Sequence, residues 1–590
     1  MLIASGTALV LATWSACVVA LTLAGLAPSL VMTRGRWTPA SARLAMWWGL
    51  FVLVTLIVAL SAALPLGSAA AGAAVVVTTL ALGLTGSLMA VRSRRRRRRA
   101  AVRRGWWLAA LSVGAAVPVI YLAAAALGPV TNYDSGLYHL GAIRYAADFS
   151  AIPGLANLYF PLGYANAEFP LAAFLGNGPW AGVGFRLLNG LILALVVIDV
   201  LLRARAGRLG AGFFVLSTGL AAALVPMVAL SDYWVTSPTS DSAVFALTLL
   251  AVAYLVDAVA SHRNWLENGS VAVLVSVLIV MLRPTMVVFA ATVVLVVVVA
   301  AVRARHISSA GPVLGRAALV SGAVLIAAAV TLARDYVLSG WVLYPLSVHS
   351  FDVPWLALDP ADTRNATLGN ARNPSDLWNA SEGWSWIGPW MERLPSQWET
   401  FEFALLAVIA VMMVSVAARC ATGGLRWRAM VLAMAPSGIM TAFWWAFTPP
   451  SYRFVWGPLF TLGAIPIGWS LARLHRSAAT RTRRSPWQWL AVGGLVVPVG
   501  AVVAFSLTTR FDAGSITERR EWAGVVPYAV APIQAAETKP QPVAGGLVLQ
   551  QPIGSDQCWT AFPLCTPQLL SIITLRGEGI QAGFAVERPG

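Results

Sequence analysis

Ionisable residues are scarce in this chain, where only 11% of the 590 residues are charged, so those that border apolar segments stand out. Asp134 and His139 follow one apolar segment by a few residues, and Asp241 begins another. A carboxylate at such a border can deprotonate a hydroxyl group, or it can bind a divalent cation beside a phosphate. Both aspartates are also good helix caps, which is the competing structural interpretation. We expect Asp134 and His139 to be catalytic, with His139 hydrogen-bonding a phosphate or sugar; the alternative is that His139 simply packs. If a metal takes part, we expect Mg²⁺ or Mn²⁺ at Asp134 and Asp241.

Arginine is well suited to holding a phosphate, because it stays charged and presents a planar fork of N–H donors. Arg283 lies in the motif LRPT inside an apolar stretch, where an unpaired charge is costly. Arg453 lies in PSYRF and Arg334 lies near the end of an apolar segment. Pairing with a structural carboxylate is the alternative for each of them. We expect these arginines to bind an anionic substrate together with Asp241, Tyr133, Glu168 and, as a further candidate, Arg186.

The stretch 129–181 carries several of these residues and lies between two strongly apolar segments. Apolar residues recur at helical spacing in 136–149 and in 166–176, while prolines break the remainder. Amphipathic segments of this kind tend to lie along a bilayer surface rather than cross it. We therefore expect an external loop that forms the floor of an active site, with Asp134 at its centre.

The elements that must position this loop are membrane spans. The chain is 58% hydrophobic, and apolar runs of about 20 residues, enough to span a ~30 Å hydrocarbon core, recur along it. One further segment, 270–302, is too short for two crossings and is broken by Arg283-Pro284, which predicts a re-entrant pair of short helices. We predict an all-α polytopic membrane protein with about twelve full crossings, at 2–32, 44–64, 69–91, 106–128, 182–203, 211–230, 241–260, 317–336, 401–418, 429–447, 455–472 and 487–507.

The net charge of +17 is concentrated in short loops between the spans, including six arginines at 94–99. Such loops remain in the cytoplasm. The basic charge therefore indicates topology and contact with the lipid bilayer, and no nucleic acid is expected as a partner. The resulting map places both termini and the loops 129–181 and 337–400 outside the cytoplasm. No cleavable signal peptide is evident.

Three parts follow from this map: a three-helix transmembrane extension with its basic cytoplasmic loop (1–104), a transmembrane core (105–507) and an extracytoplasmic tail (508–590). The tail contains the strand-like segments GGLVLQQ and LSIITL, so we expect a small α+β domain. Cys558 and Cys565 lie close together in it, and we expect them to form a stapling disulfide. The loop 337–400 is rich in tryptophan, which favours the bilayer interface, although one or two rings are candidates for stacking on sugars.

The order of these features resembles the GT-C superfamily of multi-pass glycosyltransferases: a span (106–128), then Asp134, then two amphipathic helices, and later a hairpin with LRPT. The resemblance implies a GT-C-like core with an essential acid at Asp134. No DxD motif occurs in the external loops. The segments YDSGLYHLGAIR, SPTSD, PSYRFVWG, SDQCWTAFPLC and LRGEGIQAGF are more closely similar to a poorly characterised family of bacterial multi-pass membrane proteins, over roughly residues 105–590. That second likeness implies no particular chemistry.

No Walker loop, HExxH or CxxC motif is present, which disfavours an ATP-driven pump and a zinc hydrolase. The leading hypothesis is an inverting glycosyltransferase of the bacterial plasma membrane. It moves a sugar from a polyprenyl-phosphate donor to an external glycan, lipid or protein acceptor of the cell envelope. Nucleotide sugars are cytoplasmic, so an external site needs such a lipid-linked donor. The alternatives are a transporter or flippase of an anionic lipid-linked glycan, and a non-catalytic assembly protein.

Overall fold

A computed structural model of the chain describes residues 1–35, 38–93, 106–207, 209–261, 264–304, 310–381, 383–420, 426–481, 486–510, 518–522, 526–568 and 571–587. The arginine run at 94–99 lies outside the described residues.

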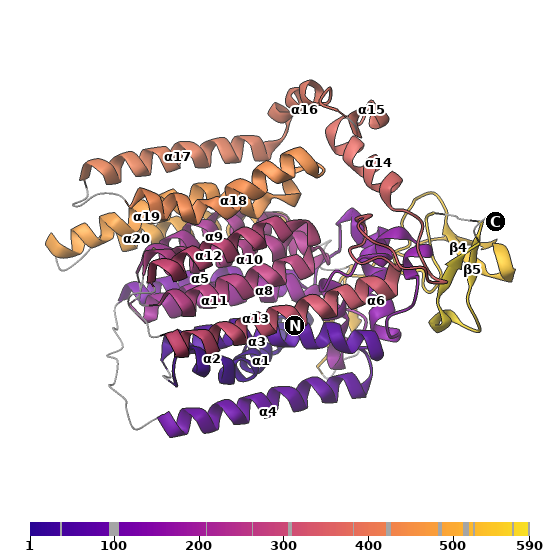
Figure 1. The fold of residues 1–590 in the computed structure, drawn as a ribbon, viewed down its shortest axis with the longest axis horizontal. Coiled ribbons are helices and arrows are strands. Elements are labelled where there is room, and N and C mark those ends of the chain that lie inside the picture. Colours follow the sequence, from indigo (N-terminus) through magenta and orange to yellow (C-terminus); the bar gives the residue numbers. More distant parts are fainter. Residues whose placement is uncertain are drawn as a thin grey trace.

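Long helices lying side by side form the body of the protein (Figure 1). Thirteen of the described helices are long and apolar enough to cross a membrane, so the chain is a multi-pass membrane protein. A helix suits this environment because it satisfies its backbone hydrogen bonds internally. The helices of the body are α1 (Leu2–Ala24), α2 (Leu26–Met32), α3 (Pro39–Ala63), α4 (Ala69–Ser93), α5 (Trp106–Ala125), α8 (Leu188–Arg205), α9 (Ala211–Ala229), α10 (Ser240–Ala260), α11 (Trp265–Leu282), α12 (Val287–Ala304), α13 (Ala310–Ser339), α17 (Trp398–Cys420), α18 (Trp427–Phe447), α19 (Trp456–Arg481) and α20 (Trp487–Arg510).

The predicted re-entrant pair at 270–302 is longer than expected. It forms α11 and α12, each with 18 residues or about 27 Å of helix, and both are long and apolar enough to cross a membrane. The short-pair prediction failed because the helices begin and end inside segments that looked like polar loops. The break does fall at Arg283-Pro284, since proline cannot continue a helix. Because the two helices form a pair, their extra length does not change which side later segments reach.

The predicted first span, 2–32, is divided at Gly25 into α1 and α2. A Cβ atom at Gly25 would lie 1.8 Å from the backbone oxygen of Ala45, and one at Gly49 would lie 1.7 Å from that of Leu21. The two glycines therefore let the backbones of the first helices and α3 meet directly. Small residues serve the same purpose in many membrane helix pairs.

The predicted loop after α5 is the α5–α8 loop, residues 126–187. It contains a π-helical turn, η2 (Ser135–His139), followed by α6 (Leu140–Asp148) and then α7 (Glu168–Leu175). Both helices fall inside the amphipathic segments predicted at 136–149 and 166–176. A single π turn of this type is rare and often marks a functional site.

The predicted loop 337–400 carries three short helices, α14 (Ala361–Arg372), α15 (Leu377–Ser381) and α16 (Ile387–Arg393), which project beyond α17 and α18 (Figure 1). Trp386 and Trp390 are buried in this region and pack with Trp445, whereas Trp384 is 60% exposed. Most of these rings therefore pack against one another, and Trp384 is the strongly exposed ring of this group.

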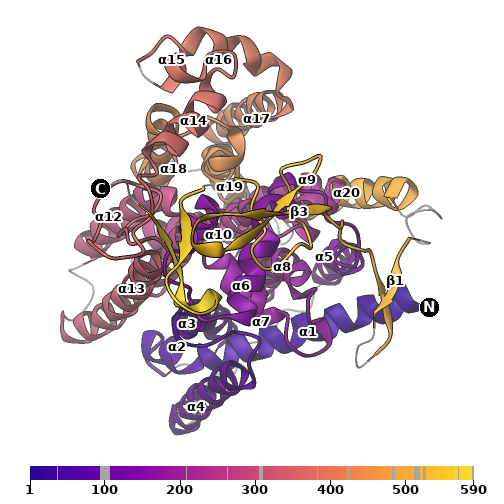
Figure 2. The same cartoon turned by 90° about the vertical axis from the view of Figure 1, so that its right-hand side faces the viewer.

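The tail forms three separate two-stranded antiparallel sheets, which lie at the end of the body that carries α6 (Figure 2). No α-helix occurs in its described residues, so the α half of the α+β prediction is wrong. Short strands separated by proline and glycine leave no run long enough for a helix. The strands are β1 (Arg520–Trp522) with β2 (Tyr528–Val530), β3 (Thr538–Pro542) with β4 (Val548–Pro552), and β5 (Ile573–Leu575) with β6 (Phe584–Val586).

A buried ion network joins four helices of the body. Asp199 on α8 pairs with Arg203 and lies 3.8 Å from the Nη1 atom of Arg43 on α3. Arg203 also pairs with Asp257 on α10, which accepts a hydrogen bond from the backbone of α9. Trp47 and Tyr254 donate to Asp199 at 2.7 and 2.8 Å. We call Arg43, Asp199, Arg203 and Asp257 the buried network.

Candidate functional site

Asp134 directly precedes η2 in the α5–α8 loop. Its backbone N–H donates to Oδ1 of Asn132 at 3.0 Å, and its side chain does not cap the turn. Instead, Oδ2 of Asp134 accepts a hydrogen bond from Nη1 of Arg453 at 3.2 Å. The two side chains are 23% and 37% exposed, respectively. Asp134 is therefore held by an arginine and is still accessible to a ligand.

A second pair, Arg283 with Asp241, lies next to the first. Arg283 follows the last residue of α11, and its Nη1 donates to the backbone oxygen of Arg453 at 3.3 Å, which connects the two pairs. Asp241 lies in the first turn of α10, where Thr239 both caps the helix and donates to Oδ2 of Asp241 at 3.0 Å. The alternative of carboxylate pairing is thus realised for Arg283, and the cap is Thr239. We call Asp134, Arg453, Asp241 and Arg283 the two-pair cluster.

One aromatic ring lies close to both arginines of this cluster. The guanidinium carbons of Arg453 and Arg283 are 4.9 and 5.4 Å from the centre of the Phe454 ring. Phe454 and Arg453 belong to the short turn η10 (Tyr452–Phe454), which is the predicted PSYRF turn. Both cations are therefore within the distance at which an aromatic ring attracts a positive charge.

Buried polar groups without partners surround the two-pair cluster. Ser135 is fully buried and Asn132 nearly so, and both lie beside Asp134 in the chain. Among the described residues, no hydrogen-bond partner is found for Nδ2 of Asn132, Oγ of Ser135, Nδ1 of His139, or either carboxylate oxygen of Glu168. A buried polar group without a partner costs about 1–3 kcal/mol. Four such groups in one place indicate a site that water or a polar ligand fills.

The titratable groups below the cluster are neutral at pH 7. Burial lowers the pKa of His139 to about 4, although Asp134 and Asp241 oppose this shift. Burial raises the pKa of Glu168 to about 8, reinforced by Asp241 and opposed by Arg283. Glu168 therefore carries a proton under ordinary conditions. The floor of the site is uncharged, and its charge resides in the two Arg–Asp pairs.

The arginines predicted to bind an anion are not all brought together. Arg334 donates to Oγ of Ser61 at 2.8 Å and lines a small cavity with Tyr164 and Phe169. Tyr138 packs edge-on against both of those rings, which places aromatic side chains between Arg334 and the cluster. Arg186 is buried and donates to the backbone oxygens of Gly128 and Ala531, so its position is structural.

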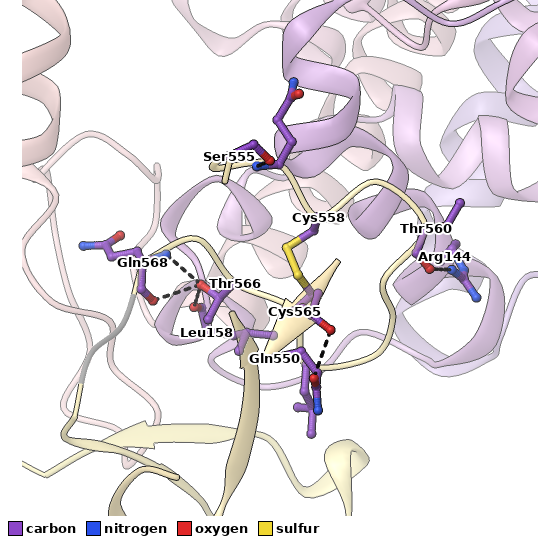
Figure 3. Close-up of a disulfide and its surroundings, with 12 residues drawn as sticks. Arg144, Leu158, Gln550, Ser555, Cys558, Thr560, Cys565, Thr566 and Gln568 are labelled. Atoms are coloured by element: carbon purple, nitrogen blue, oxygen red, sulfur yellow. Dashed lines mark hydrogen bonds between the residues drawn. A yellow bond between two sulfur atoms is a disulfide. The ribbon is translucent and has the colours of Figure 1, made fainter. Parts of the chain in front are cut away.

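The predicted disulfide between Cys558 and Cys565 is confirmed (Figure 3). The tail segment that contains it, residues 555–566, is called the disulfide segment below. The backbone N–H groups of Cys558 and Trp559 both donate to the backbone oxygen of Gly136, at 2.8 and 3.0 Å. A Cβ atom at Gly136 would lie 2.4 Å from the Trp559 ring. The disulfide segment therefore packs directly on the π turn that follows Asp134.

The disulfide segment also binds Tyr133 and Arg144, the latter in the middle of α6. The Tyr133 hydroxyl donates to Asp556, and Nε2 of Gln557 donates to the backbone oxygen of Tyr133 at 2.7 Å. Arg144 donates to the backbone oxygen of Thr560 at 2.9 Å (Figure 3). Tyr133 thus contacts the tail instead of pointing toward the two-pair cluster.

Sequence reasoning missed Tyr138, whose pKa is raised by burial and by Asp134 and Asp241, with Arg453 and Arg283 opposing. All four residues of the cluster therefore act on this one hydroxyl. Its position four residues after Asp134 puts it on the same helical face, which is the signal that could have found it. The involvement of the disulfide segment could not be found in this way, because it is distant in sequence.

The fit to a divalent cation is poor. Asp134 and Asp241 are each paired with an arginine, and no group of three His, Cys, Asp or Glu side chains lies together among the described residues. Mg²⁺ and Mn²⁺ prefer several oxygen ligands. We therefore derive no step through a metal ion.

The sequence matches a protein family described as a domain of unknown function (DUF8201) over residues 8–460. No curated protein and no solved structure matches it. The matched residues include the whole two-pair cluster and end before the disulfide segment.

Proposed function

The chain belongs to the DUF8201 family, whose function is unknown, and we propose from its site that it is a membrane glycosyltransferase. In this proposal it transfers a sugar from a polyprenyl-phosphate donor to a hydroxyl group of a cell-envelope acceptor. The reaction takes place at the extracytoplasmic face of a bacterial plasma membrane and inverts the anomeric centre.

The observation that carries this proposal is the two-pair cluster with its unpartnered polar neighbours. Arg283 and Arg453 lie close together beside the Phe454 ring, and arginine binds a phosphate through paired N–H groups. Asp134 is an accessible carboxylate in the same cluster, at 23% exposure. An anion-binding pair beside an accessible base suits the transfer of a group away from a phosphate.

The position of Arg283 favours a donor carried by a lipid. Arg283 is followed by the short turn η8 (Pro284–Met286) and then by α12, whose first residue, Val287, is 52% exposed. Further apolar side chains of α12 are exposed along its length, at Val294, Leu295, Val298 and Val302. A polyprenyl chain lying along this face would deliver its phosphate to Arg283 without leaving the bilayer.

The proposed step moves one proton and one sugar. Asp134 accepts the proton of the acceptor hydroxyl as its oxygen attacks the anomeric carbon, a role for which a positioned carboxylate is suited. The bond between that carbon and the phosphate oxygen breaks, and polyprenyl phosphate leaves with the electron pair. Arg283 and Arg453 stabilise the negative charge that develops on the phosphate. Asp134 returns its proton to water once the products leave.

The Cys558–Cys565 disulfide supports the extracytoplasmic placement, because disulfides persist in oxidising compartments. It packs on the turn after Asp134, so the site and the disulfide lie on the same side of the membrane. A site outside the cytoplasm has no access to nucleotide sugars, because these are cytoplasmic. A donor linked to a membrane lipid can reach such a site.

The test is transfer by the purified protein in liposomes with a panel of polyprenyl-phosphate sugars, measured by mass spectrometry as release of polyprenyl phosphate. We expect Asp134→Asn to reduce release by ~10²–10⁴-fold and Arg283→Ala by ~10²–10³-fold. The matched controls are Asp376→Asn and Arg364→Ala, which are exposed in the Trp-rich loop and should retain wild-type release.

Full release by Asp134→Asn would refute Asp134 as the base. If intact lipid-linked sugar instead crosses the bilayer with no release, the protein is a transporter and the enzymatic proposal is wrong. The Arg283→Ala variant should then lose transport, since the same anion site would serve it.

A further inference from the structure

A second concave site lies along α6, the helix that follows the π turn next to Asp134. It has a volume of about 480 Å³ and is bounded by α6, by the segment 176–184 and by Trp559 and Thr560 of the disulfide segment. This volume falls within the range of small-molecule sites. We call it the lateral groove.

We propose that the lateral groove binds a neutral saccharide and serves as the acceptor site, an assignment that rests on the proposed glycosyltransferase function. The argument begins with charge. Arg144 and Asp148 are the ionisable residues that line the groove, so its charge sums to zero. Its single arginine, Arg144, already donates to the backbone oxygen of Thr560, whereas the two-pair cluster places two arginines close together for a phosphate. The molecule thus divides an anionic donor from an uncharged acceptor.

The rim of the groove presents hydrogen-bonding groups of both kinds. Arg144 and Asp148 lie one turn apart on α6, and both are exposed. Arg144 is fixed by its bond to Thr560 and by the Phe562 ring, 4.4 Å from its guanidinium carbon (Figure 3). A fixed donor and a nearby acceptor suit the hydroxyl groups of a sugar, each of which can donate and accept.

The segment 176–184 exposes its backbone to the groove. Gly178 and Gly182 have φ values of +65° and +76°, which glycine adopts without strain. A Cβ atom at Gly178 would meet nothing within 4 Å, so the space above this backbone is open. Bare peptide groups provide further partners for hydroxyl groups.

The floor of the groove is apolar. It is formed by Leu140 and Ile143 of α6 and by Phe185. Sugar rings have apolar faces and polar edges, and a binding site with an apolar floor and a polar rim matches both. A lipid tail would need an apolar rim as well, which Arg144 and Asp148 do not provide.

The groove and the catalytic residue share one wall. Trp559 lines the groove and packs against Gly136, two residues after Asp134. In the proposal, a saccharide seated along α6 contacts Trp559, and its terminal hydroxyl extends past this ring toward Asp134.

The test is saturation-transfer NMR on the purified protein in phosphatidylcholine nanodiscs, with neutral tetrasaccharides built from glucose, galactose, mannose or arabinose. We expect saturation transfer from the protein to at least one of these saccharides. Ala181→Trp fills the groove from an exposed position and should weaken binding by ~10-fold or more, and Asp148→Ala by several-fold. Val348→Trp, at an exposed position of the loop 337–400, is the matched control and should bind as wild type does.

The proposal is overturned if none of the saccharides receives saturation transfer from the protein, or if Ala181→Trp leaves saccharide binding unchanged. If a saccharide binds in the groove while Asp134→Asn retains transferase activity, only the proposed mechanism fails. If sugar transfer requires Asp134 while Ala181→Trp binds and reacts normally, only the groove assignment fails. If added lipid displaces the saccharide without changing the folding stability of the protein, the groove binds a lipid and the proposal is refuted as well.

Discussion

The two-pair cluster and the buried network are built from the same two residue types and differ in how exposed their charges are. In the buried network, Asp199 is fully buried and accepts hydrogen bonds from Arg203, Trp47 and Tyr254, and Asp257 is the most exposed member, at 22%. In the two-pair cluster, Asp134 and Arg453 are 23% and 37% exposed, and among the described residues no hydrogen-bond partner is found for Nδ2 of Asn132 or Oγ of Ser135 beside them.

We interpret the buried network as structural and, under the proposed function, the more exposed two-pair cluster as a binding site. A buried ion network holds helices together, because removing one member leaves others buried and unpaired. Unpartnered atoms do not distinguish the two, since Nη1 of Arg43 and Nη2 of Arg203 also lack a hydrogen-bond partner among the described residues, so exposure is the difference. Composition alone cannot distinguish them, since each contains two arginines and two aspartates.

The largest expected effect is on catalysis, at Asp134. Asp134→Asn keeps the shape of the side chain but cannot accept a proton, so we expect sugar transfer to fall by ~10²–10⁴-fold. The melting temperature should change by only a few degrees, because an exposed pair contributes ~0–1 kcal/mol. Differential scanning fluorimetry alongside the transfer assay measures both quantities. A large loss of stability would show that the two-pair cluster is structural after all.

The next largest effect is on stability, at Asp199. Asp199→Ala leaves buried Arg43 without its carboxylate and leaves Arg203 with Asp257 as its remaining partner, which should cost ~3–5 kcal/mol of folding stability. We expect a strongly lowered melting temperature and poor yield of the folded protein. A double variant that also replaces Arg203 with Met should recover part of the loss. A variant that folds as well as wild type would contradict the assignment of a structural role to this network.

A smaller effect should come from Gly136, which connects the two-pair cluster to the tail. Gly136→Ala places a methyl group against the Trp559 ring, and overpacking of this kind costs ~1–3 kcal/mol. We expect the disulfide segment to shift and sugar transfer to fall several-fold. Gly72→Ala, where a Cβ atom meets nothing within 4 Å, is the control. Equal activity of the two variants would mean that the tail does not position Asp134.

The smallest effect should be a pH dependence of stability from Glu168. Its pKa is about 8 in the folded protein and near 4.5 when unfolded, so between these values the folded state holds a proton that the unfolded state has lost. Stability therefore falls as pH rises toward 8 and levels off above it. His139, with its lowered pKa of about 4, contributes the opposite slope only below about pH 6.5.

The window for this measurement is therefore pH 6.5 to 8, where His139 no longer contributes and the ionisation of Glu168 should cost up to ~2 kcal/mol. Melting temperatures of wild type and Glu168→Gln across this window measure the effect. We expect the decline in wild type to be absent or much reduced in the variant. If the melting temperatures of wild type and variant change in parallel with pH, Glu168 is ionised across the whole window and is paired with a cation in the folded protein.

Much of the helical body could be predicted from the sequence, because apolar length is the dominant signal in a membrane. The chain break at Arg283-Pro284 also followed from proline chemistry. The lengths of α11 and α12 could not be predicted in this way, because Glu267 in the first turn of α11 and Arg303 in the last turn of α12 are charged residues typical of loops. The division of the first predicted span at Gly25 depends on the close approach of α3, which the hydrophobic periodicity of the sequence does not reveal.

The site was predictable in part. Asp134, Asp241, Arg283 and Arg453 were chosen because each is an isolated charge beside an apolar segment, and the structure brings these four together. Arg334 satisfies the same criterion but donates to Ser61, and aromatic side chains lie between it and the two-pair cluster. One-dimensional reasoning could place a residue near a membrane surface but could not say toward which neighbour it turns. The contacts of the disulfide segment required the fold itself.

The contact between Tyr133 and Gln557 joins residues 424 positions apart in the chain. During synthesis, the turn that carries Asp134 is thus made long before the segment that packs on it. In the topology that we propose, this turn reaches its final geometry only after the late residues are translocated and Cys558 and Cys565 are oxidised. We expect a truncated chain without the disulfide segment to be inactive in sugar transfer even with every transmembrane helix in place.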